Sequence, residues 1–299
     1  MMWCCLLVVF AFHCLLVSRE SFSLAKQIGS TLPQTSSQNF KFAVFSDSHS
    51  CRTSLRDILK KASQRCDFAI HLGDFVEFDD DYEYRYFVTR IDDLIINLPL
   101  FLVRGNHETM APDGGFSHHF TKYVPQSYYS FTFGGSLFCV VDNSVGKIDS
   151  VQRKILQRTL NDFRKDNPKN PIFLFMHIAP FDLGKNDSDY LKSIVNQFKI
   201  NFVFAGDTHS YSEQKWEAAT MIVSGCAGGS IHFPSTEVHY VEVAVTQSAI
   251  TTQKIPAARD SMLLVAATYF LFVAVPRYRW YFFAGVLLLL MWEYYYYLR

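Results

Sequence analysis

Residues 40–49 read FKFAVFSDSH, an apolar run that ends in the triplet Asp47-Ser48-His49. Aromatic and β-branched residues in a short run with a polar end are typical of a buried β-strand. In α/β folds, side chains that follow the carboxyl end of a strand lie at the edge of the sheet where ligands bind. The stretch therefore predicts a strand at residues 41–46 that delivers Asp47 and His49 to a functional site.

Four later apolar runs end in polar residues in the same way. They are followed, in order, by Gly73-Asp74, by Gly105-Asn106-His107-Glu108, by His177 and by Gly206-Asp207-Thr208-His209. Each motif alone occurs by chance in many proteins, but chance does not explain five of them in one chain, each after a strand-like run. Because such strand ends converge on one edge, the set predicts a metal site. Mixed carboxylate and imidazole ligands suit Zn, Mn or Fe better than Ca or Mg.

The chain between these motifs alternates short apolar runs with amphipathic stretches. The apolar runs predict strands at residues 41–46, 68–72, 100–103, 128–133, 137–141, 172–175, 202–205, 221–224 and 238–245. The amphipathic stretches predict helices at residues 52–64, 83–96, 150–165 and 187–198. Strands and helices alternate in both halves, whereas two strands follow one another at residues 128–141. This order predicts an α/β domain over residues 40–247 with packed sheets rather than a single doubly wound sheet.

Composition narrows the range of partners. The 299-residue chain carries 28 basic and 28 acidic residues, so its formal net charge is zero. It has no basic stripe of the kind that nucleic-acid binding requires, and no nucleic acid is expected as a partner. Residues 26–39 are polar and lack periodicity, which indicates a linker, and residues 248–260 are interpreted as a second linker.

The beginning of the chain is apolar. Residues 3–17 form an uncharged run in which His13 is the one strongly polar residue. About fifteen residues suit the core of a signal peptide better than a full membrane span, which needs roughly twenty. Residues 23–25 offer a small-x-small cleavage site, although no Lys or Arg precedes the apolar run. Residues 1–25 are therefore interpreted as a signal peptide, with an uncleaved N-terminal anchor as the alternative.

Two further uncharged runs, residues 261–275 and 280–292, lie near the other end, separated by Pro276-Arg277-Tyr278-Arg279. A single helix through both runs would place two arginines near the bilayer centre, at a cost of about 3 kcal/mol each. Two transmembrane helices over residues 261–297 that turn at Pro276 avoid this cost. The alternative is a buried helical hairpin in a soluble core.

The arginines of this turn also predict an orientation, because segments rich in Lys and Arg tend to face the cytoplasm. The preceding domain then lies on the other side of the membrane, in agreement with a cleaved secretory signal. We expect a membrane protein whose main domain is extracytoplasmic, whether periplasmic, lumenal or extracellular.

Four cysteines fall in the domain, namely Cys51, Cys66, Cys139 and Cys226. An even number is compatible with two disulfides in an oxidising compartment. Buried thiols are the alternative, and it stays open. Cys51 and Cys66 flank a predicted helix of about 22 Å, which is too long for these two residues to bridge each other.

The ordered set D-x-H, G-D, G-N-H-E, H and G-x-x-H resembles the calcineurin-like metallophosphoesterase superfamily, with some likeness to its purple acid phosphatase side. The resemblance covers about 200 residues, from Phe40 to roughly Thr246. It implies a sandwich of two packed, mixed β-sheets flanked by helices, with two metal ions at one edge. The first metal would be held by Asp47, His49, Asp74 and His209. Asp74 would bridge to the second metal, which Asn106 and His177 also bind.

Three positions depart from the family pattern. Asp207 stands where the family usually has the first histidine of a G-H-x-H motif, so the second metal site either prefers harder ions or is weakened. Glu77 stands where purple acid phosphatases carry a metal-binding tyrosine, so a coloured tyrosinate–iron site is not expected. Ala179 replaces a proline of the family's H-x-P-P segment.

By resemblance, the expected activity is metal-dependent hydrolysis of a phosphomonoester or phosphodiester. Two ions of Mn, Fe or Zn would activate a bridging hydroxide. His107 would contact the phosphate or protonate the leaving oxygen. Glu108 either supports the site from behind or is a solvated loop carboxylate. The alternative function is a catalytically silent scaffold of the same fold that binds a protein partner. The pattern predicts no oligomeric state.

Overall fold

The fold is described from a computed structural model over residues 37–95, 98–115, 118–124, 126–229 and 237–258. The predicted signal or anchor at residues 1–25, most of the linker at 26–39 and the predicted hairpin at 261–297 lie outside these residues. Across the described ranges, no helix has both the length and the apolar composition that crossing a membrane requires.

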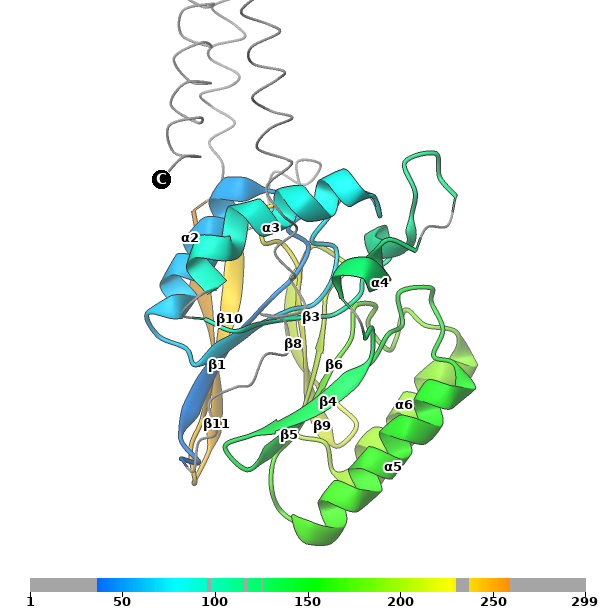
Figure 1. Ribbon diagram of the computed structural model, residues 1–299. Coiled ribbons are helices and arrows are strands. Elements are labelled where there is room, and N and C mark those ends of the chain that lie inside the picture. Colours follow the sequence, from blue (N-terminus) through cyan, green and yellow to red (C-terminus); the bar gives the residue numbers. More distant parts are fainter. Residues whose placement is uncertain (1–36, 96–97, 116–117, 125, 230–236, 259–299) are drawn as a thin grey trace, which may run out of the picture. The chain divides into compact units, whose positions relative to one another are not determined.

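Two mixed β-sheets form the centre of the described domain (Figure 1). The first sheet has the order β11 (Ile250–Pro256), β10 (His239–Val245), β1 (Phe40–Phe45), β2 (Phe68–His71), β3 (Leu100–Leu102). The second has the order β4 (Tyr129–Phe133), β5 (Ser136–Val140), β6 (Ile172–Phe175), β7 (Phe202–Ala205), β9 (Ala219–Ser224), β8 (Tyr211–Trp216). The expected α/β sandwich of two mixed sheets is confirmed.

Helices cover the outer face of each sheet. They are α2 (Arg52–Ser63) and α3 (Asp81–Ile95) on the first sheet and α5 (Ser150–Asp166) and α6 (Lys185–Phe198) on the second. Two short helices, α4 (Phe120–Tyr123) and the 3-10 turn at His107–Thr109, lie in the loops. The alternation along β1 explains the layering, because Ala43 and Phe45 pack under α2 while Phe42 and Val44 face the other sheet. Figure 1 shows α5 and α6 side by side on the second sheet.

A layer of phenylalanine rings fills the space between the sheets. Phe42 and Phe68 stack within the first sheet with ring centroids 5.3 Å apart, and Phe138 and Phe173 stack within the second at 5.0 Å. Phe42 also meets Phe173 edge to face across the layers at 5.2 Å. Each such pair contributes about 0.5–1.5 kcal/mol beyond the burial of its area. The rings therefore fix the spacing of the two sheets and, with it, the distance between their edges.

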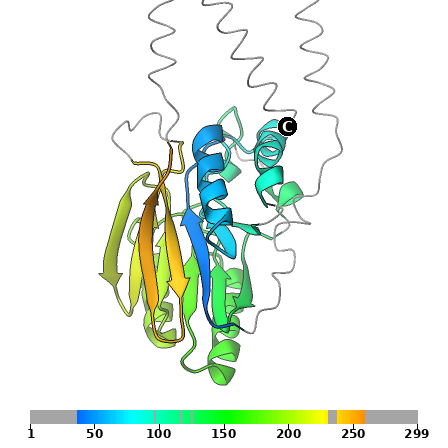
Figure 2. The same ribbon diagram turned by 90° about the vertical axis from the view of Figure 1, so that its left-hand side faces the viewer.

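The register places the ends of the central strands beside one another. β1, β2 and β3 are parallel in the first sheet, and β5, β6 and β7 are parallel in the second. β11 runs in the same direction as β1, because both pair with β10 in antiparallel fashion; Figure 2 shows these two arrows pointing the same way. The carboxyl ends of the central strands are thus brought to one edge of the domain.

One boundary prediction is wrong. Residues 248–260 were expected to be a linker, but β11 at Ile250–Pro256 pairs along its whole length with β10. Its sequence ITTQKI alternates between half-buried and exposed residues, as an edge strand with one solvated face does. The domain therefore extends past residue 247. The open question about cysteines is also answered, since none of Cys51, Cys66, Cys139 and Cys226 takes part in a disulfide.

Candidate metal centre

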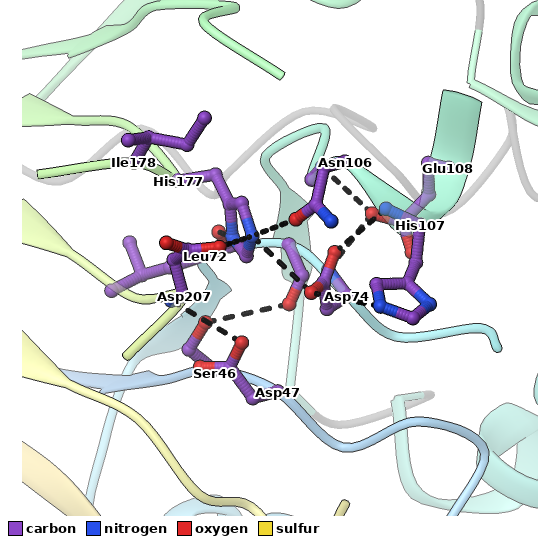
Figure 3. A network of polar contacts seen from close by, with 12 residues as sticks. Ser46, Asp47, Leu72, Asp74, Asn106, His107, Glu108, His177, Ile178 and Asp207 are labelled. Carbon is purple, nitrogen blue, oxygen red and sulfur yellow. Dashed lines mark hydrogen bonds and ion pairs between the residues drawn. The ribbon is translucent and has the colours of Figure 1, made fainter. Parts of the chain in front are cut away.

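The seven predicted ligands lie in one cluster at the carboxyl edge, and Figure 3 labels Asp47, Asp74, Asn106, His177 and Asp207 among them. They follow five strands: Asp47 and His49 follow β1, Asp74 follows β2, Asn106 follows β3, His177 follows β6, and Asp207 and His209 follow β7. Backbone hydrogen bonds hold these loops together, because the N–H of Asp47 donates to the Gly73 carbonyl and that of Gly206 to the His177 carbonyl. The sequence prediction that the strand ends converge is confirmed.

One half of the cluster surrounds His177, which is fully buried. Its Nε2 lies 2.9 Å from Asn106 Oδ1, 3.3 Å from Asp74 Oδ2 and 3.5 Å from Asp207 Oδ1. Its Nδ1 donates to the Leu72 carbonyl at 2.8 Å, so in a neutral ring Nε2 is a bare lone pair that faces three oxygens. Such an arrangement requires a cation at Nε2, either a metal ion or a proton.

The electrostatics of His177 give the same result. Burial alone lowers the pKa of this ring, but the charge of Asp74 and the hydrogen bonds with Asp207 and Asp74 outweigh burial and raise the pKa well above its usual value. The site thus attracts a positive charge to the position where a metal ion would bind.

The other half of the cluster contains two imidazoles that face each other. His49 Nε2 lies 3.3 Å from His209 Nε2, and these atoms lie 3.7 Å from Asp74 Oδ2 and from Asp47 Oδ1 respectively. Burial lowers the pKa of His49 to about 4, although Asp74 opposes the shift, so the ring is neutral near pH 7. His49 Nδ1–H donates a hydrogen bond to Glu77 Oε2 at 3.1 Å, which leaves Nε2 as the potential ligand atom.

The residues present fit two metal ions. Three groups of residues could each hold a metal ion, because within each group the potential ligand atoms lie within 4.8 Å of one another. The groups are Asp47-His49-His209, His49-Asp74-His107 and Asp47-Asp74-His177. Asp47 Oδ2 is buried and has no hydrogen-bond partner among the described residues. Burying a carboxylate oxygen without a partner is costly, and a cation removes that cost. Burial accordingly raises the pKa of Asp47, against the opposing charge of His177.

Several of these residues have unusual backbone conformations. Asp47, Asp74 and Asp207 have φ values of 58°, 54° and 69°, in the left-handed region that non-glycine residues seldom occupy. Strained backbone of this kind clusters at functional sites, where the surrounding structure holds it in place. Gly105 is required for a different reason, since a Cβ there would lie 2.2 Å from Asp74 Oδ1.

Glu108 supports the centre from behind. It is fully buried, and its carboxylate accepts hydrogen bonds from the backbone N–H groups of Asp74 (2.8 Å), Phe75 (2.8 Å), Val76 (3.1 Å) and Gly105 (2.7 Å). Of the two roles that the sequence left open, the structure therefore excludes a solvated loop carboxylate. Glu108 joins the loop after β2 to the loop after β3 and so fixes Asp74 relative to Asn106.

Sequence reasoning missed two further buried supports. His71 Nε2 donates to Ser48 Oγ at 2.9 Å while its Nδ1 accepts from the Gly73 N–H, which holds the loop between Asp47 and His49. Asn143 Oδ1 accepts from the N–H groups of His177 and Ile178, each at 3.1 Å. The available signals were a histidine at the end of an apolar strand and an asparagine just after one.

His107 lies at the rim of the cluster. Its Nδ1 donates to the Glu77 carbonyl at 2.7 Å, and its backbone N–H donates to Asp74 Oδ1 at 3.0 Å. Its Nε2 lies 4.0 Å from Asp74 Oδ2, and the ring centroid is 4.5 Å from that of His49. Because Nδ1 is occupied by the carbonyl, Nε2 is the atom that faces the centre.

Comparison with known proteins agrees with this geometry. A family model described as calcineurin-like phosphoesterase matches residues 40–211, which is more than half of the chain. No curated protein is significantly similar in sequence.

Among solved structures, a dimetal phosphatase from Danio rerio is 13% identical, with 73% of this chain and 96% of that chain covered and a TM-score of 0.55. GAP50, the anchor in the inner membrane complex of Plasmodium, is 13% identical over 73% and 84% of the two chains, with a TM-score of 0.52. PhoD is 12% identical over 75% and 70%, with a TM-score of 0.51. At these identities the likeness concerns the fold. The family match and the clustered Asp and His side chains together place this chain in the calcineurin-like phosphoesterases, a superfamily of metallophosphoesterases.

Proposed function

We propose that the protein hydrolyses phosphate esters with two metal ions held at the carboxyl edge of its sheets. The observation that carries the proposal is the position of Asp74, whose Oδ2 lies 3.7 Å from His49 Nε2 in one half of the cluster and 3.3 Å from His177 Nε2 in the other. A carboxylate shared in this way is suited to bridge two cations. When bound, two such ions would clamp the phosphate and lower the pKa of a water between them.

The ligands divide into two sets. Asp47, His49, Asp74 and His209 form the first set, and Asp74, Asn106, His177 and Asp207 form the second. The first set offers two nitrogens and two carboxylates, whereas the second offers one nitrogen and three oxygen-bearing side chains. Oxygen-rich sites suit harder ions, so we assign Mn or Fe to the second set and Mn, Fe or Zn to the first.

His107 is proposed as the general acid. The Glu77 carbonyl fixes the proton of Nδ1, which leaves Nε2 to carry the proton that the leaving oxygen needs. Two further residues position the ligands through their backbone. Glu108 accepts from the N–H of Asp74, and Asn143 accepts from the N–H of His177. Within the superfamily, we propose a place near the purple acid phosphatases on the likeness of the ordered motifs. The position of their metal-binding tyrosine is taken by Glu77, which contacts His49. The colour of a tyrosinate–iron site is therefore not expected.

The activity can be tested with the full-length protein, p-nitrophenyl phosphate and bis(p-nitrophenyl) phosphate. We expect chelation to abolish hydrolysis and added Mn²⁺ to restore it. His107→Gln should lower kcat by about 10²–10⁴-fold with unchanged metal content, because it removes proton transfer and not a ligand. The matched control is His118→Gln at an exposed loop histidine, which should behave like the wild type.

If metal binds but neither ester is cleaved, the proposal is wrong. That result would favour the alternative, a catalytically silent scaffold of the same fold that binds a protein partner. GAP50 is described as an anchor, and its fold is similar to that of this chain. If His107→Gln instead loses metal, His107 is a ligand, as its place in one of the three ligand groups also allows.

We further propose that the protein is anchored in a membrane by residues 261–297, with the phosphoesterase domain extracytoplasmic. The support is the sequence, with two uncharged runs around Arg277 and Arg279. A reporter inserted between these arginines should be cytoplasmic, and one inserted in residues 26–39 should not be. The opposite labelling would reverse the orientation.

A further inference from the structure

The proposed centre carries little positive charge for a site that must bind an anion. Its ligands include three carboxylates, those of Asp47, Asp74 and Asp207, and metal binding requires them to be ionised. Together with two divalent cations they leave one positive unit of charge. The hydroxide of the proposed reaction would cancel that unit, so the charge of the complex would equal the charge of the bound phosphate ester.

The Lys and Arg side chains that the structure describes do not pair with these carboxylates. Among the described residues, every ion pair of these three carboxylates is with a histidine, and none is with Lys or Arg. Arg104, two residues before Asn106, donates to the Glu108 carbonyl, lies 3.8 Å from Asp142 Oδ2 and is 5.0 Å from the centre of the Phe120 ring. None of these three partners is a proposed metal ligand.

Further negative charge lies at the rim. Glu77 is about half exposed and contacts His49 at 3.1 Å. Asp182 follows His177 by five residues in the loop before α6, and its pKa is raised first by burial and then by the charge of Asp207. The surroundings therefore add to the negative charge of the ligands and do not offset it.

Asp207 is the ligand carboxylate most open to a substrate. Its side chain is 33% exposed, whereas those of Asp74 and Asp47 are 3% and 0% exposed. Its backbone N–H donates to Asp47 Oδ1 at 3.2 Å, which holds the loop while the carboxylate reaches His177. Its charge is thus fixed at the surface of the centre, where it acts directly on an incoming phosphate.

We propose that Asp207 makes this site select monoanionic phosphodiesters over dianionic phosphomonoesters. The inference rests on the proposed two-metal function and names its substrate class. With two divalent ions and the hydroxide between them, a diester would give a complex with one negative charge, whereas a monoester above its second pKa of about 6 would give a complex with two. Unit charges this close interact strongly in a partly buried site.

The test replaces Asp207 with Asn, which removes the charge of the side chain and keeps its shape. Full-length protein loaded with Mn²⁺ alone is compared with Asp207→Asn at pH 8, using phenylphosphonate as the dianion and its monomethyl ester as the monoanion. We expect Asp207→Asn to bind the dianion about tenfold more tightly relative to the monoanion, as the loss of one nearby charge predicts. The ratio of kcat/KM for p-nitrophenyl phosphate to that for bis(p-nitrophenyl) phosphate should rise by a similar factor.

Controls separate charge from metal loss. Elemental analysis of each variant gives its metal content, and Asp207→His removes the same charge while it keeps a ligand atom. A variant that retains both metals shows whether the charge of Asp207 determines the preference for diesters. If both variants lose the second metal, Asp207 acts as a ligand only and the inference is overturned. Asp166→Asn, at the exposed end of α5, should leave both ratios unchanged.

Failure of this inference differs from failure of the proposed function. A metal-loaded wild type that cleaves monoesters as well as diesters, with ratios that Asp207→Asn does not change, overturns the selection but keeps the hydrolase. A metal-loaded wild type that cleaves neither ester overturns both.

Discussion

Replacing Asp74 with Asn should remove both metal ions together and lower kcat/KM by about 10³-fold, the order of loss seen when a group that stabilises the transition state is deleted. Asp74 belongs to two of the three groups of potential ligand atoms, and its Oδ2 lies within 3.7 Å of both His49 Nε2 and His177 Nε2. An amide carries no charge and one acceptor oxygen, so it cannot bridge two cations. Elemental analysis of the purified full-length variant, beside steady-state kinetics, measures both effects.

The variant should fold, because Asn is among the few residues that tolerate a positive φ such as the 54° of Asp74. Asp113→Asn serves as the matched control, since Asp113 is exposed on a loop and contacts the N–H of Gly115. Loss of one metal alone would assign Asp74 to a single ion. Unchanged metal content would remove Asp74 from the centre altogether.

Glu108→Gln should lower both stability and metal affinity. Four backbone N–H groups converge on the carboxylate, and the amide NH₂ of glutamine would point a donor at some of them. Leaving buried donors without acceptors costs about 1–3 kcal/mol each, so a total of about 3 kcal/mol is expected after relaxation. Metal affinity should fall by about 10–100-fold, as it does when the supports of a metal ligand are removed.

Denaturant unfolding of the metal-free protein measures the first effect, and metal titration well below the melting temperature measures the second. Glu108→Asp keeps the charge and should restore part of both. A variant that is less stable but binds metal like the wild type would show that Glu108 supports the fold and does not position Asp74. Wild-type stability in Glu108→Gln would contradict the role altogether.

Most of the fold could be predicted from the sequence, because its central strands are buried on both faces. β1, β2, β6 and β7 read as nearly continuous apolar runs, and burial of a strand on two sides demands that composition. The edge strands β8 and β11 were missed for the complementary reason. Each has one hydrogen-bonded neighbour and a solvated face, so its sequence carries polar residues that look like a linker.

The cluster of ligands could be predicted because polar residues follow apolar runs in a fixed order. The residues that support these ligands from behind could not be predicted. Glu108 binds backbone N–H groups, and His71 holds the loop of Asp47 and His49 through one serine hydroxyl. Such contacts depend on how loops from different strands approach, which no local pattern encodes. The effect of Asp207 on the net charge of the site could also not be predicted, because it depends on whether Lys or Arg side chains lie nearby.

The left-handed backbone of Asp47, Asp74 and Asp207 has an evolutionary consequence. Gly, Asn and Asp adopt such φ values most readily, so the substitutions that these loops tolerate best are Asp→Asn and Asp→Gly. Those same changes would remove a charged group from the proposed metal centre. The architecture can therefore outlive its chemistry, and a lineage of this domain could turn from hydrolase to docking platform by single steps that leave the sandwich intact.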